Sequence, residues 1–525
     1  MKKGLMKSLV AAVAMGLAVG FGACTPQNEP DSGGNAATDT TTNVGDDDND
    51  FVENQTWNNT ISITWDGSAV TVNGEADGVT VTNNDGIVTV KSTAKHIEYA
   101  LSGQGTGQIT FYSDYKFKLS LNGVVLIASD GPAINNQCKK TCYVVLTDTN
   151  VLADAATYST SSEDRKGAFF SEGQIVVSGD GSLSVSGRVK HALASDDYIR
   201  VRSGAILLTA TMSDGMHAND GIIIDGGSLK INAVGDGIQC DSSSIVIRGG
   251  EVNVATAGDK GLLAYGNILV SGGTITVKSS DKGIKTHSDL EVQGGTITVI
   301  AGSSNSGTYA PGRLGGDSSG AEGIEAKGAM KFSGGYVYAQ ASDDAINSGG
   351  DMVINGGYVC AYSTGNDGLD ANGNCYIESG LVYAIGSGSP EVAVDVNSEE
   401  QKKLYVKGGT LIAIGGLESG ASLTQACYSA SSWSLNTWYS FVCGSDTYAF
   451  LTPASAGTPL VVSASSQPAV KSGVTTSGGE TIFNGMLLLG PNVSGGTDVS
   501  LSSYSGGNSG GGPGGGHGGG PGGWF

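Results

Sequence analysis

Residues 281–299 read DKGIKTHSDLEVQGGTITV, and two other stretches of the chain repeat the pattern. They are DGIQCDSSSIVIRGGEVNV at 236–254 and DDAINSGGDMVINGGYVCA at 343–361. Each copy holds three short runs of alternating apolar and polar residues, separated by turns rich in Gly, Asp, Ser and Asn. Between Val189 and Ile414 the pattern returns about every 22–24 residues, which is typical of a repeat architecture.

This alternation predicts strands with one side inward and the other outward. Three strands per copy, stacked copy on copy, predict an all-β fold: a right-handed, single-stranded parallel β-helix (a solenoid) with irregular β caps at both ends. Stacked copies place equivalent residues ~4.8 Å apart. Function is therefore expected in columns of outward residues and in the loops between strands.

The composition disfavours one class of partner and favours another. The 525 residues carry a formal net charge of −22, with 50 acidic against 28 basic residues. No basic stretch is concentrated enough to follow phosphates, so nucleic acid is not expected as a partner. Acidic columns suit divalent cations, although acidity also keeps a secreted protein soluble.

The N-terminus has the features of a bacterial export signal. Three lysines precede an apolar run at 9–19 that is too short to span a bilayer permanently. The sequence then reads FGAC at 21–24, which resembles a lipobox, whose Cys is lipidated and begins the mature protein. We therefore expect a lipid anchor at Cys24 that attaches the protein to the bacterial outer membrane or cell surface. A plain secretory signal, cleaved elsewhere, is the alternative.

Changes in composition divide the chain into expected regions. These are a lipoprotein signal peptide (1–23), a disordered tether (24–55), an N-terminal cap with the first β-coils (56–150), the regular β-helix (151–416), a C-terminal β-region (417–500) and a Gly-rich disordered tail (501–525). An insertion at 302–319 interrupts the coils, and such insertions often serve binding. Cys138 with Cys142, and Cys427 with Cys443, are candidate disulfides in an oxidising compartment.

Acidic residues occupy equivalent positions in the last regular coils. The predicted metal ligands are Glu322, Glu325, Asp343, Asp344, Asn347, Asp367, Asp370 and Asp395. Carboxylates stacked this closely repel one another unless they share a cation, and Ca²⁺ accepts many oxygen ligands in loose geometry. The alternative is that Asp and Asn are favoured turn residues that accept backbone N–H groups.

Upstream, the same columns are basic or neutral, with His217 and Gln239 before the lysines and His287 nearby. Lys260, Lys282 and Lys285 follow one another beside the acidic coils. This pattern fits recognition of an acidic sugar, and it also fits a calcium-dependent polyuronate lyase of the pectate type, with Lys285, Lys282 or Arg313 as the base. The remaining interpretation is an ordinary solvated face of surface lysines.

A further column contains tyrosines after the Gly-Gly turns. By alternation, Tyr336, Tyr338, Tyr358 and Tyr383 are expected to point outward in three consecutive coils. Exposed aromatic rings stack on the apolar faces of sugars, so these residues are predicted to bind carbohydrate. Alternatively, the rings cover the sheet beneath a terminal segment.

The repeated Asp-Gly-Ile and Gly-Gly pattern, preceded by GPAI at 131–134 and GDGSLSV at 179–185, resembles a known family. It is similar to the carbohydrate-binding β-helix family whose clostridial founder binds cellulose and acidic sugars, and the likeness covers about residues 60–480. The resemblance implies a polysaccharide-lyase-like parallel β-helix, bound Ca²⁺, and polysaccharide binding without established cleavage. The family's coil aspartates correspond to Asp214, Asp236, Asp259, Asp281, Asp343, Asp344 and Asp367. The chain departs from the family pattern where Lys260 and Lys282 stand in place of a second Asp.

Together these features predict a surface-anchored, calcium-dependent lipoprotein that binds polysaccharide, with acidic or plant cell-wall glycans as ligands. Its expected partners are polysaccharide and, through Cys24, a membrane; the chain is expected to be a monomer. The alternatives are a calcium-dependent polyuronate lyase and a non-catalytic structural or adhesive surface rod.

Overall fold

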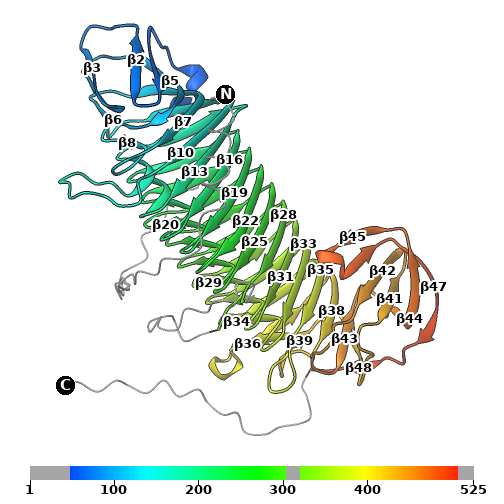
Figure 1. The fold of residues 1–525 in the computed structure, drawn as a ribbon. Helices are drawn as coiled ribbons and strands as arrows, with labels where there is room; N and C mark the ends of the chain where they lie inside the picture. Colours follow the sequence, from blue (N-terminus) through cyan, green and yellow to red (C-terminus); the bar gives the residue numbers. More distant parts are fainter. Residues whose placement is uncertain (1–47, 303–319, 507–525) are drawn as a thin grey trace, which may run out of the picture. The chain divides into compact units, whose positions relative to one another are not determined.

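The computed structural model describes residues 48–302 and 320–506, which form an all-β structure (Figure 1). About 13 turns of chain stack into a parallel β-solenoid, so the predicted parallel β-helix is confirmed. Cys24 and Arg313 lie outside the described residues. None of the helices in the described part has the length and apolar character needed to cross a bilayer.

Each regular coil contributes one strand to each of three ladders, as the repeat predicts. The first ladder is a 14-stranded sheet in which β3 and β4 are antiparallel and the later neighbours are parallel. Its strands are β3 (Val79–Asn84), β4 (Ile87–Ser92), β6 (Gln108–Ser113), β8 (Ile134–Asn136), β11 (Gly167–Ser171), β14 (His191–Ser195), β17 (Met216–Ala218), β20 (Ile238–Cys240), β23 (Leu262–Ala264), β26 (Ile284–Thr286), β29 (Ile324–Ala326), β32 (Ile346–Ser348), β34 (Leu369–Ala371) and β36 (Val394–Val396).

The second and third ladders are joined into one 28-stranded sheet by long strands that run through both. The long strands are β5 (Ile97–Thr106), β7 (Phe117–Ile127), β33 (Met352–Ser363) and β35 (Cys375–Ile385). The second ladder also contains β9 (Cys142–Thr147), β12 (Ile175–Gly179), β15 (Tyr198–Val201), β18 (Gly221–Ile224), β21 (Ile245–Ile247), β24 (Ile268–Val270), β27 (Leu290–Val292), β30 (Met330–Phe332), β37 (Leu404–Val406) and β39 (Ser422–Leu423). The third contains β10 (Thr149–Ala153), β13 (Ser182–Gly187), β16 (Ala205–Ala210), β19 (Ser228–Ala233), β22 (Glu251–Ala257), β25 (Thr274–Ser279), β28 (Thr296–Ile300), β31 (Tyr336–Ala341) and β38 (Thr410–Ile414).

Inward side chains from all three ladders form one continuous core. In β26 and β29 the buried Ile284 and Ile324 stack in register, and Val277 and Val299 do the same in the third ladder. This stacking lets each coil bury its apolar face against its two neighbours, which a single coil cannot do alone.

The close approach of neighbouring coils explains the repeated glycines. Gly273, the second residue of a Gly-Gly turn, has φ +87°, and a Cβ there would lie 2.9 Å from the backbone of Gly249 and Gly250. At Gly237, in the Asp-Gly-Ile motif, a Cβ would lie 2.5 Å from the carbonyl oxygen of Gly261. Both turns therefore require glycine to let the coils stack.

The chain ends in a separate six-stranded antiparallel sheet, drawn at the C-terminal end of the coils in Figure 1. Its strands, in spatial order, are β45 (Glu480–Ile482), β46 (Leu487–Leu489), β42 (Asp446–Leu451), β41 (Trp438–Cys443), β44 (Ala469–Ser477) and β47 (Asn492–Asp498). Phe441 and Phe450 of this sheet share a second apolar core with residues of β31, β33, β35 and β38. The sheet thus covers the outside of the last coils, at the third ladder.

The predicted tether is ordered at its end. Two short 3-10 helices, η2 (Asp48–Asp50) and η3 (Val52–Asn54), lie against the second ladder. The Asp50 carboxylate is 3.1 Å from the Arg200 guanidinium, and Phe51 lies beneath the guanidinium of Arg202, 4.1 Å from ring to Cζ. The prediction of disorder up to residue 55 is therefore wrong for 48–54, because long-range ion pairs fix this segment.

Two further predictions concern the C-terminal part and the cysteines. The predicted disordered tail begins with an ordered strand, β48 (Ser502–Tyr504), which pairs with β40 (Cys427–Ala430), so the prediction is wrong for these residues. Cys138, Cys142, Cys427 and Cys443 are all free thiols in the structure, so neither candidate disulfide is formed.

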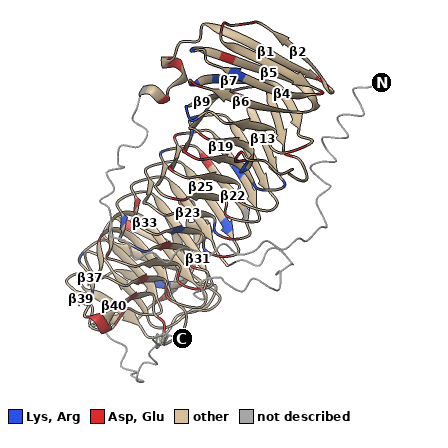
Figure 2. Ribbon diagram, turned by 90° about the vertical axis from the view of Figure 1, so that its left-hand side faces the viewer, with Lys and Arg blue, Asp and Glu red and all other residues tan. Residues whose placement is uncertain are grey.

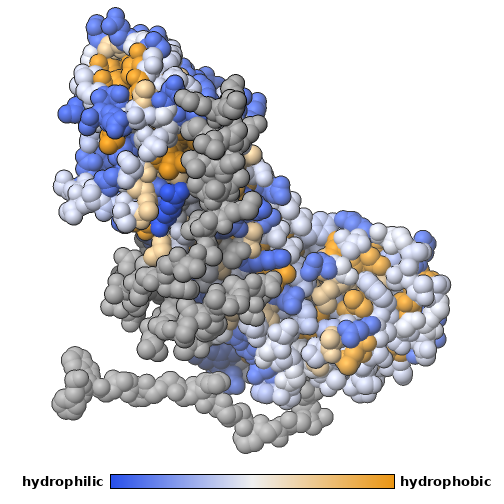
Figure 3. All heavy atoms as spheres, in the orientation of Figure 1, coloured by the Kyte–Doolittle hydropathy of each residue, from blue (hydrophilic) through white to orange (hydrophobic). Residues whose placement is uncertain are grey.

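On the face drawn in Figure 3 the described surface is mainly polar, with small, separate apolar patches.

Candidate functional site

Two outward columns run side by side along the first ladder, and we call them together the charged strip. The first column lies two positions before the inward residue of each strand: His191, Asp214, Asp236, Lys260, Lys282, Glu322, Asp344 and Asp367. The second column is the middle residue of each strand: His217, Gln239, Leu263, Lys285, Glu325, Asn347, Asp370 and Asp395. Asp344, Asp367 and Asp370 thus lie on one side of the coils.

Charge changes in blocks along the strip. Histidine and aspartate come first, lysine with aspartate or glutamate follow, and aspartate with asparagine come last. Figure 2 shows acidic and basic residues distributed along the stacked coils rather than gathered in one wide patch of a single sign. The electrostatic surroundings of each block therefore depend on its own neighbouring residues.

The middle block is a buried network of lysines and glutamates. Lys282 forms an ion pair with Glu322, and its ammonium is 3.3 Å from Glu325. Lys285 lies 3.9 Å from Glu325, and Lys327 also pairs with that carboxylate. The predicted calcium ligands Glu322 and Glu325 are thus neutralised by ammonium groups, which corrects their assignment to the metal site.

This network also bears on the lysines predicted as catalytic bases. Lys282 is 0% exposed and Lys285 only 2%. Burial alone would lower the pKa of Lys282, but the adjacent glutamates outweigh it and raise the pKa. A general base must be neutral and within reach of substrate, so the structure gives no support to Lys282 in this role.

The last block contains carboxylates that have no cationic neighbour in the described part of the chain. Asn347 Nδ2 lies 3.1 Å from Asp344 Oδ2 and 2.7 Å from Asp370 Oδ2, so one amide sits between two carboxylates of adjacent coils. Among the described residues, the groups that act most strongly on the pKa of Asp344, Asp367 and Asp370 are other carboxylates, the Asn347 amide and backbone N–H groups, and none is a Lys, Arg or His. Asp395 continues the second column one coil further on.

Burial and mutual repulsion disfavour the charged forms of these groups. Burial first, and then the neighbouring carboxylates, raise the pKa of Asp344 to about 7, of Asp367 to about 8 and of Asp370 to about 6. Burial and contact with Glu418 likewise raise the pKa of Asp395. At neutral pH these carboxylates therefore need either a proton or a cation.

The turn interpretation accounts for part of the first column. Asp344 Oδ1 accepts the backbone N–H of Asp367 at 3.1 Å, and Asp214 Oδ1 accepts that of Asp236 at 2.9 Å. Each such aspartate uses one oxygen to hold the next coil and keeps the other for the side chains beside it. The backbone role and a ligand role are therefore compatible.

The last block offers oxygen donors of the kind that Ca²⁺ takes. Asp344 and Asp370 offer carboxylate oxygens on both sides of Asn347, whose amide would present its oxygen after a half-turn. Asp367 and Asp395 supply further carboxylates in the same two columns, and Asp343 precedes the first column by one residue. Hard oxygen donors in a flexible set are what Ca²⁺ prefers.

The tyrosine column divides into two pairs. Tyr338 is 3% exposed and Tyr383 0%, because the C-terminal sheet covers them; Tyr383 donates its hydroxyl hydrogen to the Leu451 carbonyl at 2.8 Å. Their prediction as sugar-stacking residues is wrong, and the packing alternative holds for them. Tyr336 and Tyr358 remain half-buried, with rings stacked at 4.7 Å and 4°.

A cavity that the sequence did not predict is lined by one member of this pair, Tyr358. It measures about 460 Å³ and lies between the coils and the C-terminal sheet, where Tyr448, Asp446 and Gln425 also line it. Contacts between residues this far apart in sequence leave no local signal. The outward alternation of Tyr358 was the only hint of this part of the surface.

The coils and their outward columns define a parallel β-helix that presents side chains at fixed spacing. The sequence model of one family, described as carbohydrate-binding domain-containing proteins, matches residues 84–368. This match spans more than half of the chain, so the chain belongs to that family.

Other comparisons add little. No curated protein matches the sequence. Among solved structures, one described as the polysaccharide lyase-like protein from C. thermocellum, a gadolinium derivative, is similar at 22% identity and a TM-score of 0.33. That likeness covers 46% of this chain and 94% of the other, and it is too distant to bear on function.

Proposed function

We propose that the protein binds polysaccharide in a calcium-dependent manner at the bacterial cell surface, where a lipid at Cys24 anchors it. Membership of the carbohydrate-binding family supports a polysaccharide as the ligand. The observation that carries the calcium dependence is the last block of the charged strip, where Asp344 and Asp370 flank Asn347 without a cationic neighbour among the described residues.

Calcium would act here by holding the last coils in register. Ions shared by Asp344, Asp367 and Asp370 would remove the repulsion between carboxylates of adjacent coils. The same coils carry the stacked rings of Tyr336 and Tyr358, and Tyr358 also lines the cavity beside the C-terminal sheet. Acidic or plant cell-wall glycans are the proposed ligands, because a bound divalent cation also attracts uronate carboxylates.

A pull-down experiment tests this function. The purified protein is incubated with insoluble cellulose and with immobilised polygalacturonate, each in the presence of excess chelator or of excess Ca²⁺. We expect retention with Ca²⁺ and loss of retention with chelator. Equal retention in both conditions would remove the calcium dependence, and no retention on any glycan would leave the surface-rod alternative.

The anchor is tested separately. Replacing Cys24 by Ala should move the protein from the membrane fraction to the soluble fraction, because no lipid can be attached. Replacement of the buried Cys240 by Ala is the control that should leave the distribution unchanged. A Cys24→Ala protein that stays in the membrane fraction would argue against lipidation at this residue.

A further inference from the structure

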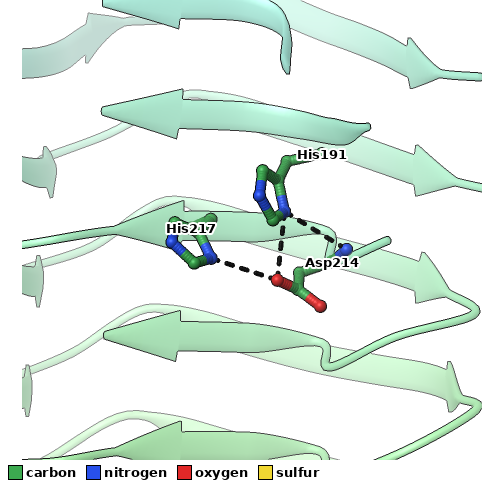
Figure 4. A group of neighbouring side chains, drawn as sticks. All are labelled: His191, Asp214 and His217. Atoms are coloured by element: carbon green, nitrogen blue, oxygen red, sulfur yellow. Dashed lines mark hydrogen bonds and ion pairs between the residues drawn. The ribbon is translucent and has the colours of Figure 1, made fainter. Parts of the chain in front are cut away.

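Two imidazoles and a carboxylate converge at the start of the charged strip (Figure 4). His191 begins β14, and His217 is the middle residue of β17 in the next coil. Asp214 Oδ2 lies 3.0 Å from His191 Nδ1 and 3.0 Å from His217 Nδ1. One ligand atom from each of the three residues lies within 4.8 Å of the others.

Stacking of the coils brings these groups together. The register pairs Ala194 with His217, and the small alanine leaves room for the His217 ring to lie beside that of His191. The two rings are stacked with centroids 4.1 Å apart and planes at 26°. Asp214 and His217 are buried, whereas His191 is half-buried, so the cluster is held by the coils but is open on one side.

Hydrogen bonds from neighbouring residues orient the cluster. Asp241 Oδ2 lies 3.1 Å from His217 Nε2, and Gln239 donates to Asp241 Oδ1 at 2.7 Å. Asp214 Oδ1 accepts the backbone N–H of Asp236, which leaves Oδ2 for the imidazoles. Metal-bound histidines in proteins generally donate their second ring N–H to a carboxylate in this way, and metal-bound carboxylates are themselves hydrogen-bonded.

We propose that His191, Asp214 and His217 bind a divalent transition-metal ion of the Zn²⁺ class. Two imidazole nitrogens and one carboxylate oxygen are a ligand set that Zn²⁺ accepts and that Ca²⁺, which takes oxygen ligands, does not. Three protein ligands leave a fourth position for water or an anionic group of a bound glycan. The site is independent of the calcium proposal.

The distance between the two proposed sites allows them to be tested apart. Five coils separate Asp214 from Asp344 in the first column, which corresponds to about 24 Å at ~4.8 Å per coil. The intervening Lys282 and Glu322 form their own ion pair. A substitution at one site should therefore leave the other ion in place.

The competing account is a network held by protons alone. The same separations suit hydrogen bonds from the two rings to Asp214, and the Ser213 hydroxyl lies 3.1 Å from His191 Nδ1. Such a network would bind no ion in stoichiometric amount. Binding of a spectroscopic metal therefore separates the two accounts.

The experiment uses the purified full chain, stripped with chelator and titrated with Co²⁺, whose visible absorption reports nitrogen and oxygen ligands. We expect saturation at one ion per chain and displacement of the Co²⁺ by Zn²⁺. His191→Gln and His217→Gln should abolish the absorption. Asp241 contacts the His217 ring but is not a proposed ligand, so Asp241→Asn should weaken binding about 10–100-fold.

Matched controls test two other histidines and one proposed calcium ligand. His287→Gln, His517→Gln and Asp367→Asn should each bind Co²⁺ as the natural chain does. Circular dichroism in chelator confirms that each variant is folded, and Asp241→Asn still tests the proposal if the histidine variants are not. Absence of a stoichiometric Co²⁺ signal, or a signal that survives in the His191→Gln and His217→Gln variants, would overturn the site.

Discussion

At the scale of single residues, the aspartates of the first column divide their two oxygens between two tasks. Asp344 Oδ1 accepts the N–H of Asp367, while Oδ2 faces Asn347. Asp214 repeats this division, with Oδ2 facing His191 and His217. Asparagine at such a position would keep the backbone acceptor and lose the charge, so the two tasks can be separated by mutation.

For Asp344 this separation gives a direct prediction. Asp344→Asn should keep its stability in chelator within about 1 kcal/mol, because its amide oxygen still accepts the Asp367 N–H, but it should lose most of its Ca²⁺ affinity. Asp344→Ala should lose both, with a cost of about 1–3 kcal/mol for the unsatisfied N–H. Calcium titration and denaturant unfolding measure the two effects. Unchanged Ca²⁺ affinity in Asp344→Asn would exclude this residue as a ligand.

The raised pKa values of the last block predict how stability depends on pH. Asp344, Asp367 and Asp370 have folded-state pKa values of about 7, 8 and 6, above the value of about 3.9 for an unfolded Asp. A raised pKa means that the folded state holds the proton more tightly, so this stability is full below about pH 4 and is lost as pH rises to about 8. In chelator, the Tm should therefore fall between pH 5 and pH 8.

Calcium should reverse this trend, since it replaces the protons. The increase in Tm on adding Ca²⁺ should be larger at pH 8 than at pH 5, and Asp370→Asn should reduce it. A calcium effect that is equal at both pH values would contradict the proposed competition between protons and metal.

At the scale of strands and turns, the repeat in the sequence contained most of the information about the coils. Alternating residues such as Ile284 and Val299 predicted the inward face, and the Gly-Gly pairs predicted the turns. Alternation could not distinguish a solvent-exposed outward residue from one covered by another sheet. Tyr338 and Tyr383 were mispredicted for that reason, since their cover comes from the C-terminal sheet.

The turn glycines give a prediction at this scale. Gly273→Ala should destabilise the coils by about 1–3 kcal/mol or more, because it combines a φ of +87° with contact to the preceding coil. Gly485→Ala is the matched control: its φ is +89°, but nothing lies within 4 Å of the added Cβ. Denaturant unfolding of both variants compares them. Equal losses would mean that backbone strain alone, and not coil stacking, requires the glycine.

The half-buried pair of Tyr336 and Tyr358 gives another prediction. Tyr358→Ala should weaken retention on glycan, because it removes a ring from the Tyr336 stack and from the wall of the cavity. Tyr376→Ala is the control, since Tyr376 and Tyr405 form a similar stack on the second ladder, with centroids 4.9 Å apart at 8°. If both variants lose retention equally, aromatic stacking in general would be responsible rather than this surface.

At the scale of the whole molecule, the sequence predicted the architecture better than the site. Stacking follows from a pattern repeated in every coil, whereas the site depends on which charged neighbours each column supplies. Glu322 and Glu325 match the acidic pattern, yet Lys282 of the preceding coil pairs with both. His191 and His217 come from different coils, so only the register of β14 with β17 shows that they meet.

The segment at 48–54 is another part of the structure that the local sequence did not predict. Its composition is that of a tether, but Asp50 and Glu53 pair with Arg200 and Arg202, about 150 residues away in the chain. Breaking a buried ion pair exposes an uncompensated charge, so these contacts keep the N-terminal segment on the coils. The position of residues 48–54 therefore depends on long-range contacts that composition does not record.

The central claim is that stacked aspartates of the last coils share a calcium ion, and diffraction from crystals grown with Ca²⁺ tests it most directly. We expect anomalous density between Asp344 and Asp370, with Asn347 presenting its amide oxygen to the ion. Clear density for those side chains with no ion between them, at Ca²⁺ concentrations that support glycan binding, would contradict the claim.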